Sequence, residues 1–92
     1  MKGSKIENKQ TIKDALCVQV SPRKKVWVYF EDDTFPNKGG YYCKAYATEE
    51  RDERFMAYDF TIRKEELGCA ENRVKNALSR AKTKVETYFR PM

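Results

Sequence analysis

GCAENRVKNALSRAKTKVETYF, residues 68–89, decides the fold of this chain. Apolar side chains recur along it at steps of three and four residues, which is the spacing of one face of an α-helix. These residues are Val74, Ala77, Leu78, Ala81, Val85, Tyr88 and Phe89. Glu71 suits the positive end of such a helix, and Pro91 stops it. An apolar stripe cannot be left in water, so we expect the rest of the chain to supply a matching face.

The residues before this helix predict strands, because the apolar period changes to two. We expect strands near 16–20 and 25–31, joined by a turn with Pro22 at its second position. Further strands are expected at 41–48 and 54–62, separated by a wide loop with a short helical kink. The predicted fold class is therefore α+β: an antiparallel meander of three or four strands, with one long C-terminal helix packed across one face.

Alternation assigns side chains to the two faces of this sheet. We expect the helix to cover the more apolar face. This face is formed by Val26, Val28 and Phe30 of the second strand and by Met56, Tyr58, Phe60 and Ile62 of the fourth. The set Tyr41, Cys43, Ala45 and Ala47 suits a closely packed helix. The opposite face then shows Trp27, Tyr29, Tyr42, Lys44 and Tyr46, with Phe55 and Asp59. That face is unusually aromatic for one in contact with solvent.

The chain of 92 residues is long enough for one small domain, which we place at 11–92. Residues 1–10 are polar and lysine-rich, and we expect them to form a flexible basic tail. No apolar run approaches the roughly 18 residues that span a bilayer. The beginning of the chain lacks the apolar segment of a signal peptide, so we expect a cytoplasmic location. Phages and mobile elements are the context in which we expect such a domain.

The formal net charge of +5 is distributed unevenly. Residues 1–30 and 73–92 are basic, whereas residues 31–72 are acidic. Two interpretations remain open: the fold brings opposite charges together and the field cancels, or both basic ends share one surface.

Catalysis has little support in the sequence. There is no histidine, no phosphate-binding glycine loop and no visible nucleophile beside a base. A histidine-free ribonuclease that uses lysine, arginine, tyrosine and glutamate remains an alternative. We expect no cofactor and no metal, because Cys17, Cys43 and Cys69 are far apart in sequence and the acidic turn at 31–33 lacks the pattern of a calcium loop. A zinc ion held by the three cysteines and a carboxylate is the alternative.

Two functions follow from the surfaces. The first is a non-catalytic interaction module that binds a protein partner, or itself as a homodimer, through the sheet face of Trp27, Tyr29, Tyr42, Lys44 and Tyr46. The alternative is a DNA- or RNA-binding domain, since cations contact phosphate and rings stack on bases. Its expected contact residues are Arg23, Lys24, Lys25, Arg73, Lys75, Arg80, Lys82 and Lys84.

The order of elements over Val26–Phe89, a strand meander followed by a helix, is similar to that of two kinds of DNA-binding module. These are the small modules of plant transcription factors and the arm-binding modules of tyrosine recombinases. The resemblance implies that the sheet lies in a major groove with its outward side chains toward base edges. The strand arginines of such modules are missing here, because Trp27, Tyr29, Tyr42 and Tyr46 occupy those positions.

Overall fold

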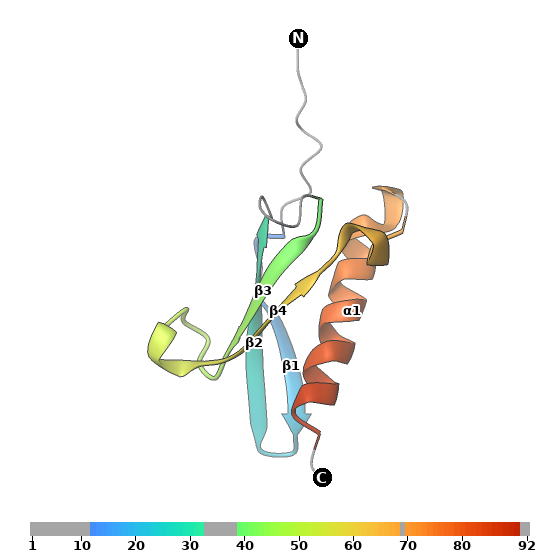
Figure 1. Ribbon diagram of the computed structural model, residues 1–92. Helices are drawn as coiled ribbons and strands as arrows, with labels where there is room; N and C mark the ends of the chain where they lie inside the picture. Colours follow the sequence, from blue (N-terminus) through green and yellow to red (C-terminus); the bar gives the residue numbers. More distant parts are fainter. Residues whose placement is uncertain (1–11, 33–38, 69, 91–92) are drawn as a thin grey trace.

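The computed structural model of the protein describes residues 12–32, 39–68 and 70–90. Four strands precede one α-helix: β1 (Leu16–Ser21), β2 (Lys24–Asp32), β3 (Tyr41–Tyr46), β4 (Met56–Ile62) and α1 (Arg73–Tyr88). Neighbouring strands are antiparallel and lie in the order β1-β2-β3-β4 (Figure 1). The predicted α+β meander with one C-terminal helix is confirmed.

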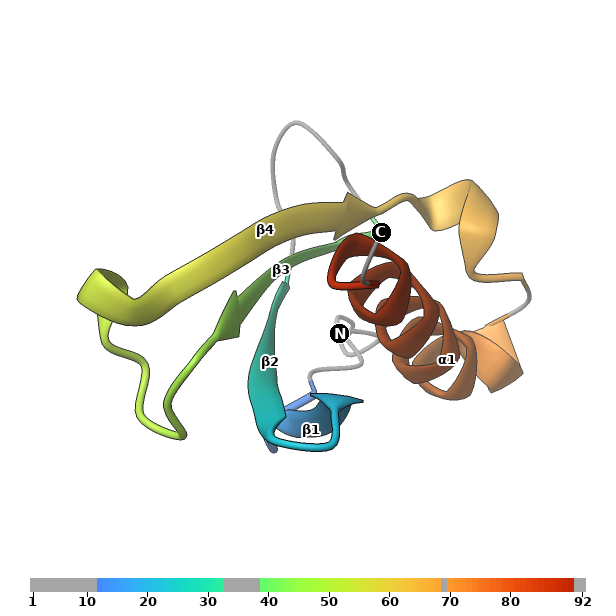
Figure 2. The ribbon, with the colours of Figure 1, turned by 90° about the horizontal axis from the view of Figure 1, so that it is seen from below.

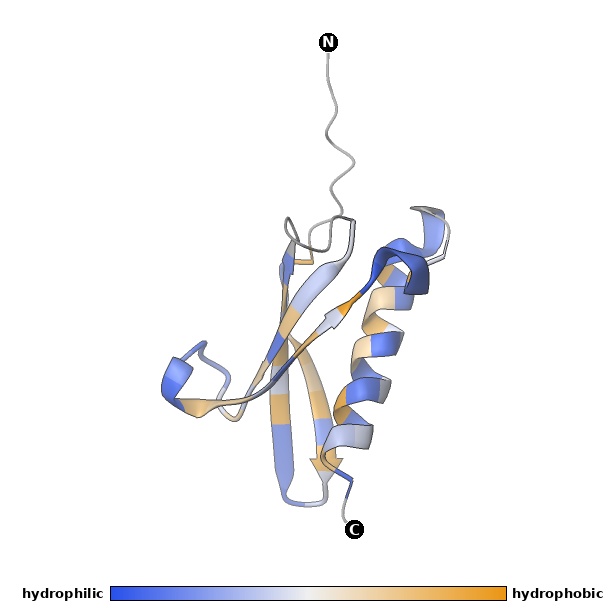
Figure 3. Cartoon of the chain, in the orientation of Figure 1, coloured by the Kyte–Doolittle hydropathy of each residue, from blue (hydrophilic) through white to orange (hydrophobic). Residues whose placement is uncertain are grey.

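The sheet curves around one side of α1, and the core lies between them (Figure 2). Val18 of β1, Val26 and Val28 of β2, and Ala81 and Val85 of α1 are almost fully buried there. Burial of each such aliphatic side chain contributes about 1.5–3 kcal/mol. The small buried side chains of Ala77 and Ala81 let α1 approach the sheet closely. Hydrophobic residues recur at every second position of β2 and at steps of three and four along α1, with hydrophilic residues between them (Figure 3). The predicted core face of the second strand is therefore correct.

The α-helix begins at Arg73, five residues later than the predicted stretch. Two short 3₁₀-helices, η3 (Lys64–Glu66) and η4 (Ala70–Asn72), precede it. Gly68 lies between them with a φ of 73°, a conformation that interrupts a right-handed helix and suits glycine. Asn76 then donates a hydrogen bond of 2.7 Å to the carbonyl of Leu67, which fastens the helix to the preceding turn.

The register between β3 and β4 shifts at a β-bulge between Ala45 and Tyr46, which interrupts the strict alternation predicted for the fourth strand. Met56 pairs with Tyr46, and its side chain is 36% exposed, so the prediction that it belongs to the core is wrong. Ala47, predicted to extend the core face of β3, is exposed because the strand ends at Tyr46. The expected helical kink is present slightly later, as the 3₁₀-helix η2 (Glu53–Phe55).

Some predictions concern residues outside the described ranges: the basic tail at 1–10, Cys69 and the stop at Pro91. In the part of the chain that the structure covers, no helix is both long and apolar enough to cross a membrane.

Candidate nucleic-acid interface

The five residues predicted to bind a partner lie together on the sheet face opposite α1. The register pairs Trp27 with Tyr46 and Tyr29 with Lys44 across β2 and β3. Tyr42 follows on the same face and donates a hydrogen bond of 2.7 Å to the carboxylate of Asp59. This bond, with smaller contributions from desolvation and from the negative charge, raises the pKa of Tyr42. The sequence thus grouped these residues correctly.

The chain itself covers part of this face. The segment 47–55, which joins β3 to β4, folds back so that the Ala47 N–H donates to the carbonyl of Phe55. The hydroxyl of Tyr29 donates to the carbonyl of Glu49, and that of Tyr46 donates to Glu53 over 2.8 Å. Tyr46 is completely buried as a result, and it offers no surface to a partner.

Charged side chains complete this closure. The guanidinium of Arg51 donates to Glu31 and lies 5.0 Å from the centre of the Tyr29 ring. Lys44 lies 3.8 Å from the carboxylate of Glu53 and close to the ring of Tyr42. The side chains that close this face on itself form what we call the closed cluster: Tyr29, Glu31, Tyr42, Lys44, Tyr46, Arg51 and Glu53.

Trp27 is half-buried, like Tyr29, Tyr42 and Lys44, and it lies beside the β1–β2 turn. An open groove of about 420 Å³ runs past it, lined by Gln19, Pro22, Arg23, Lys24, Lys25, Trp27 and Ala47. Three of the eight cations predicted to bind nucleic acid, Arg23, Lys24 and Lys25, are exposed here. The groove therefore joins one residue of the predicted sheet site to three residues of the predicted nucleic-acid site.

The cations of α1 do not form one surface. Arg73 points inward: its guanidinium donates to the carbonyl of Gly39 and lies 5.3 Å from the centre of the Tyr41 ring. Lys75 is exposed, and Lys82 forms an i,i+4 ion pair of 3.3 Å with Glu86. Arg73 is consequently a structural contact between the helix and the start of β3.

Arg80 and Lys84 lie on the flank of α1 that faces β4 and η3. Their nitrogens are 3.9 Å and 3.6 Å from the carboxylate of Glu66. Partial burial acts to raise the pKa of Glu66, but the hydrogen bond from the Arg63 N–H and the two nearby cations lower it overall. One carboxylate thus faces two cations, and the Arg80 side chain is still 54% exposed.

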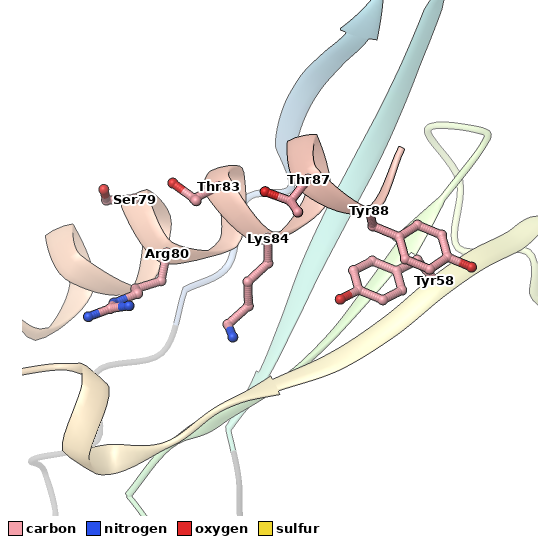
Figure 4. A pocket seen from close by; sticks show the side chains of 7 residues that line it. All are labelled: Tyr58, Ser79, Arg80, Thr83, Lys84, Thr87 and Tyr88. Carbon is pink, nitrogen blue, oxygen red and sulfur yellow. The ribbon is translucent and has the colours of Figure 1, made fainter. Parts of the chain in front are cut away.

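A groove of about 700 Å³ opens between this flank and β4 (Figure 4). Arg80 and Lys84 extend from α1 toward β4, while Ser79, Thr83 and Thr87 follow the outer side of the helix. Tyr58 of β4 and Tyr88 of α1 stack face to face, with ring centres 3.8 Å apart and planes inclined by 11°. Tyr88 is 55% exposed. We call Tyr58, Tyr88, Arg80 and Lys84 the open cluster.

The two basic segments of the sequence meet in space. The ammonium of Lys24, in the hairpin, lies 4.8 Å from the centre of the Phe89 ring at the end of α1. We call the bases beside the β1–β2 turn, in the second half of α1 and just after it the basic end: Arg23, Lys24, Lys25, Arg80, Lys82, Lys84 and Arg90. Glu66 and Glu86 form ion pairs with three of them. The acidic turn at 49–53 lies away from the helix, on the other side of the sheet (Figure 2). Charge is therefore separated in part: the acids at 49–53 lie away from α1, whereas Glu66 lies against its cations.

Cys17 and Cys43 cannot share a metal ion. Cys17 pairs with Trp27 on the outer face of the sheet, whereas Cys43 is buried on the face that α1 covers. Burial raises the pKa of the Cys43 thiol, so it is an unreactive core residue. The zinc alternative that requires all three cysteines is thus excluded.

Sequence reasoning did not predict that Tyr58 and Tyr88 stack on each other. It assigned Tyr58 to the core and Tyr88 to the apolar stripe of the helix. Tyr88 lies in the last turn of α1 and stacks on Tyr58 of β4. A tyrosine at the end of an apolar stripe, followed by Phe89 and Arg90, is the signal that was available.

Comparison of the chain with protein-family models, with curated protein sequences and with solved structures gives no match. The topological resemblance to DNA-binding modules thus gains no support from a matching structure. The function has to be inferred from the geometry.

Proposed function

We propose that this protein is a non-catalytic domain that binds nucleic acid through its basic end. The observation that supports the proposal is the contact between Lys24 and Phe89, because it joins the hairpin cations to the helix cations. Phosphate groups that follow this end meet several cations in succession and few carboxylates. Such a surface favours a polyanion, and the release of counterions from it supplies much of the binding free energy.

The contact residues of the proposal are a subset of those expected from the sequence. Arg23, Lys24 and Lys25 present exposed cations at the hairpin turn, and Arg80 presents one at the groove. Lys82 and Lys84 contribute with part of their charge balanced by glutamates. Lys75 is exposed nearer the helix start, and Arg73 is omitted because it contacts Gly39 and Tyr41.

The experiment is a titration of labelled oligonucleotides with the protein at several salt concentrations. The test variant Lys25→Glu with Arg80→Glu reverses one charge in each basic segment. The control variant Lys13→Glu with Arg54→Glu reverses two exposed charges elsewhere, and each pair lowers the formal charge from +5 to +1, two units per substitution. We expect the test variant to bind at least about tenfold more weakly, with a salt slope lower by about 2.

The matched control separates a located site from a general effect of net charge. Equal weakening by both variants would contradict the proposed interface, and absence of salt-dependent binding by the wild-type protein would contradict the proposed function. Circular dichroism establishes that both variants are folded.

A protein partner, or a second copy of the chain, is the second candidate. Phe55 and Met56 are adjacent apolar residues with exposed fractions of 46% and 36%, and Met56 pairs with Tyr46 of the closed cluster. An apolar contact of this kind barely responds to salt. Sedimentation at two salt concentrations tests it: a salt-insensitive dimer that Phe55→Ser dissociates supports self-association, and a monomer at high concentration contradicts it. A cytoplasmic location is consistent with either function and belongs to the proposal.

A further inference from the structure

We propose that Tyr88, supported by Tyr58, is a stacking platform for an unpaired base, so that the ligand of the basic end is a single-stranded nucleic acid. This inference rests on the proposed function and names its ligand class. It concerns a site between α1 and β4, which is separate from the sheet face that the sequence indicated.

The platform is the end of a column of three rings. Phe60 and Tyr58, both half-buried on β4, have ring centres 4.9 Å apart and planes inclined by 24°. Tyr88 stacks on the Tyr58 ring, and Phe89 contacts both tyrosines edge-on at 6.3 Å and 4.9 Å. One face of Tyr88 is thus covered by Tyr58, and its 55% exposure leaves the other face to solvent. A planar base placed there continues the column.

The groups around the platform suit a nucleotide chain. Arg80 and Lys84 lie one helical turn apart on the same flank, both on one side of the platform, and can contact successive phosphates of a strand whose base stacks on Tyr88. The hydroxyls of Ser79, Thr83 and Thr87 line the same groove and can donate to phosphate or sugar oxygens. Glu66 is the carboxylate that faces both cations, and Glu65 and Arg63 lie in the adjoining groove.

A single strand fits this arrangement better than a duplex or an acidic peptide. In a duplex the faces of the bases are stacked on one another, so an exposed tyrosine ring finds no partner. An acidic peptide satisfies the cations but leaves the ring face unused. Base stacking on an aromatic side chain is tolerant of sequence, because every base has a π-face. We therefore expect affinity for single strands with little dependence on base sequence.

The test uses four probes of ten residues: deoxythymidine, uridine, a stable abasic deoxyribose chain and a duplex. The abasic probe carries the phosphates without the bases. Tyr88→Leu removes the ring and keeps an apolar side chain, whereas Tyr88→Phe keeps the ring. We expect Tyr88→Leu to bind the thymidine and uridine probes about 5- to 100-fold more weakly, with the abasic and duplex probes unchanged. Tyr88→Phe is expected to bind like the wild-type protein.

Phe55→Leu is the matched control, since it removes an aromatic ring of similar exposure outside the basic end. It is expected to leave every probe unchanged. The inference is overturned if Tyr88→Leu binds the thymidine probe like the wild-type protein, if the wild-type protein does not distinguish thymidine from abasic chains, or if polyglutamate binds equally well. Salt-dependent binding with no effect at Tyr88 overturns this inference alone, whereas absence of salt-dependent binding overturns the proposed function. A difference between the thymidine and uridine probes is assigned to the sugar if a deoxyuridine probe binds like the thymidine probe, because thymidine and uridine differ in the base methyl group as well as in the 2′-hydroxyl.

Discussion

The turn that joins β3 to β4 and the groove between β4 and α1 are built from the same kinds of side chain. The closed cluster combines three tyrosines with two cations and two glutamates, and the open cluster combines two tyrosines with two cations that face Glu66. In the closed cluster the rings of Tyr29 and Tyr46 meet edge to face at 5.6 Å, and their hydroxyls donate to Glu49 and Glu53. In the open cluster Tyr88 keeps 55% of its surface exposed beside a half-exposed Arg80.

Arrangement, more than composition, therefore separates a structural cluster from a binding surface. The closed cluster satisfies its hydroxyls and charges within the chain, which stabilises the turn. The open cluster has two cations for one carboxylate and a ring with one covered face. Substitutions in the two clusters test this contrast.

Replacement of the two tyrosines separates the clusters by stability. Tyr46→Ala removes a completely buried aromatic ring and leaves Glu53 without its donor, so we expect a loss of about 3–5 kcal/mol in the free energy of unfolding. Tyr88→Ala is expected to cost less than about 1 kcal/mol, since the side chain is mostly exposed. Urea unfolding measures both values. Similar losses for the two variants would refute the distinction between the clusters.

Gly68 has a positive φ and follows the 3₁₀-helix η3, which carries Glu66 of the open groove. Gly68→Ala places a Cβ on a residue with a φ of 73° and 3.0 Å from the amide nitrogen of Asn76. We expect a loss of about 1–2 kcal/mol. Gly68→Asn has the same Cβ but tolerates positive φ better, so a smaller loss is expected in thermal unfolding. Equal losses would assign the effect to the contact with Asn76.

Glu66→Gln removes the carboxylate that competes for Arg80 and Lys84. We expect nucleic acid to bind about two- to fivefold more tightly at low salt, because more positive charge is available to phosphate. The variant is expected to lose about 0.5–1.5 kcal/mol of stability at neutral pH. Weaker binding of oligonucleotides by this variant would show that the carboxylate orients the cations productively.

The stability difference between Glu66→Gln and the wild-type protein is expected to depend on pH. The pKa of Glu66 is lower in the folded protein than its ordinary value of 4.5, so its contribution is fully present above that value. The contribution is lost as the pH falls through the lowered pKa. Thermal unfolding at pH 7 and at successively lower pH tests this, and a difference that grows on acidification would contradict the assignment.

Arg51→Gln is expected to have the smallest effect. It removes the ion pair with Glu31 and the contact with the Tyr29 ring, both at a partly exposed site. We expect a loss of at most about 1 kcal/mol, smaller at high salt, and no change in oligonucleotide binding. A reduced affinity for oligonucleotides would show that the closed cluster takes part in the interface.

The sequence was sufficient for the fold because its periods are unambiguous. The step of three and four in 68–89 and the alternation of Val26, Val28 and Phe30 require a helix on one sheet face, and short connections favour a meander. The register of β4 was not predictable, since a bulge at Ala45 and Tyr46 depends on local backbone geometry. This bulge is the reason why Met56, which was predicted to lie in the core, is exposed.

The site was predictable only in part. The sequence grouped the sheet aromatics and named the cations, but the fold-back of 47–55 over Tyr46 depends on hydrogen bonds between residues far apart in the chain. The meeting of Lys24 with Phe89 and of Tyr58 with Tyr88 depends on where the helix ends on the sheet. Contacts of this kind have no local pattern.

The most direct test of the central claim is a map of the binding surface by amide chemical shifts. The ¹⁵N-labelled protein is titrated with the thymidine oligomer at low salt. We predict shifts concentrated at 79–88 and at 23–25, with little change at 47–55. Shifts centred on Trp27, Tyr42 and 47–55, with the helix unaffected, would contradict the account and assign the interface to the aromatic sheet face.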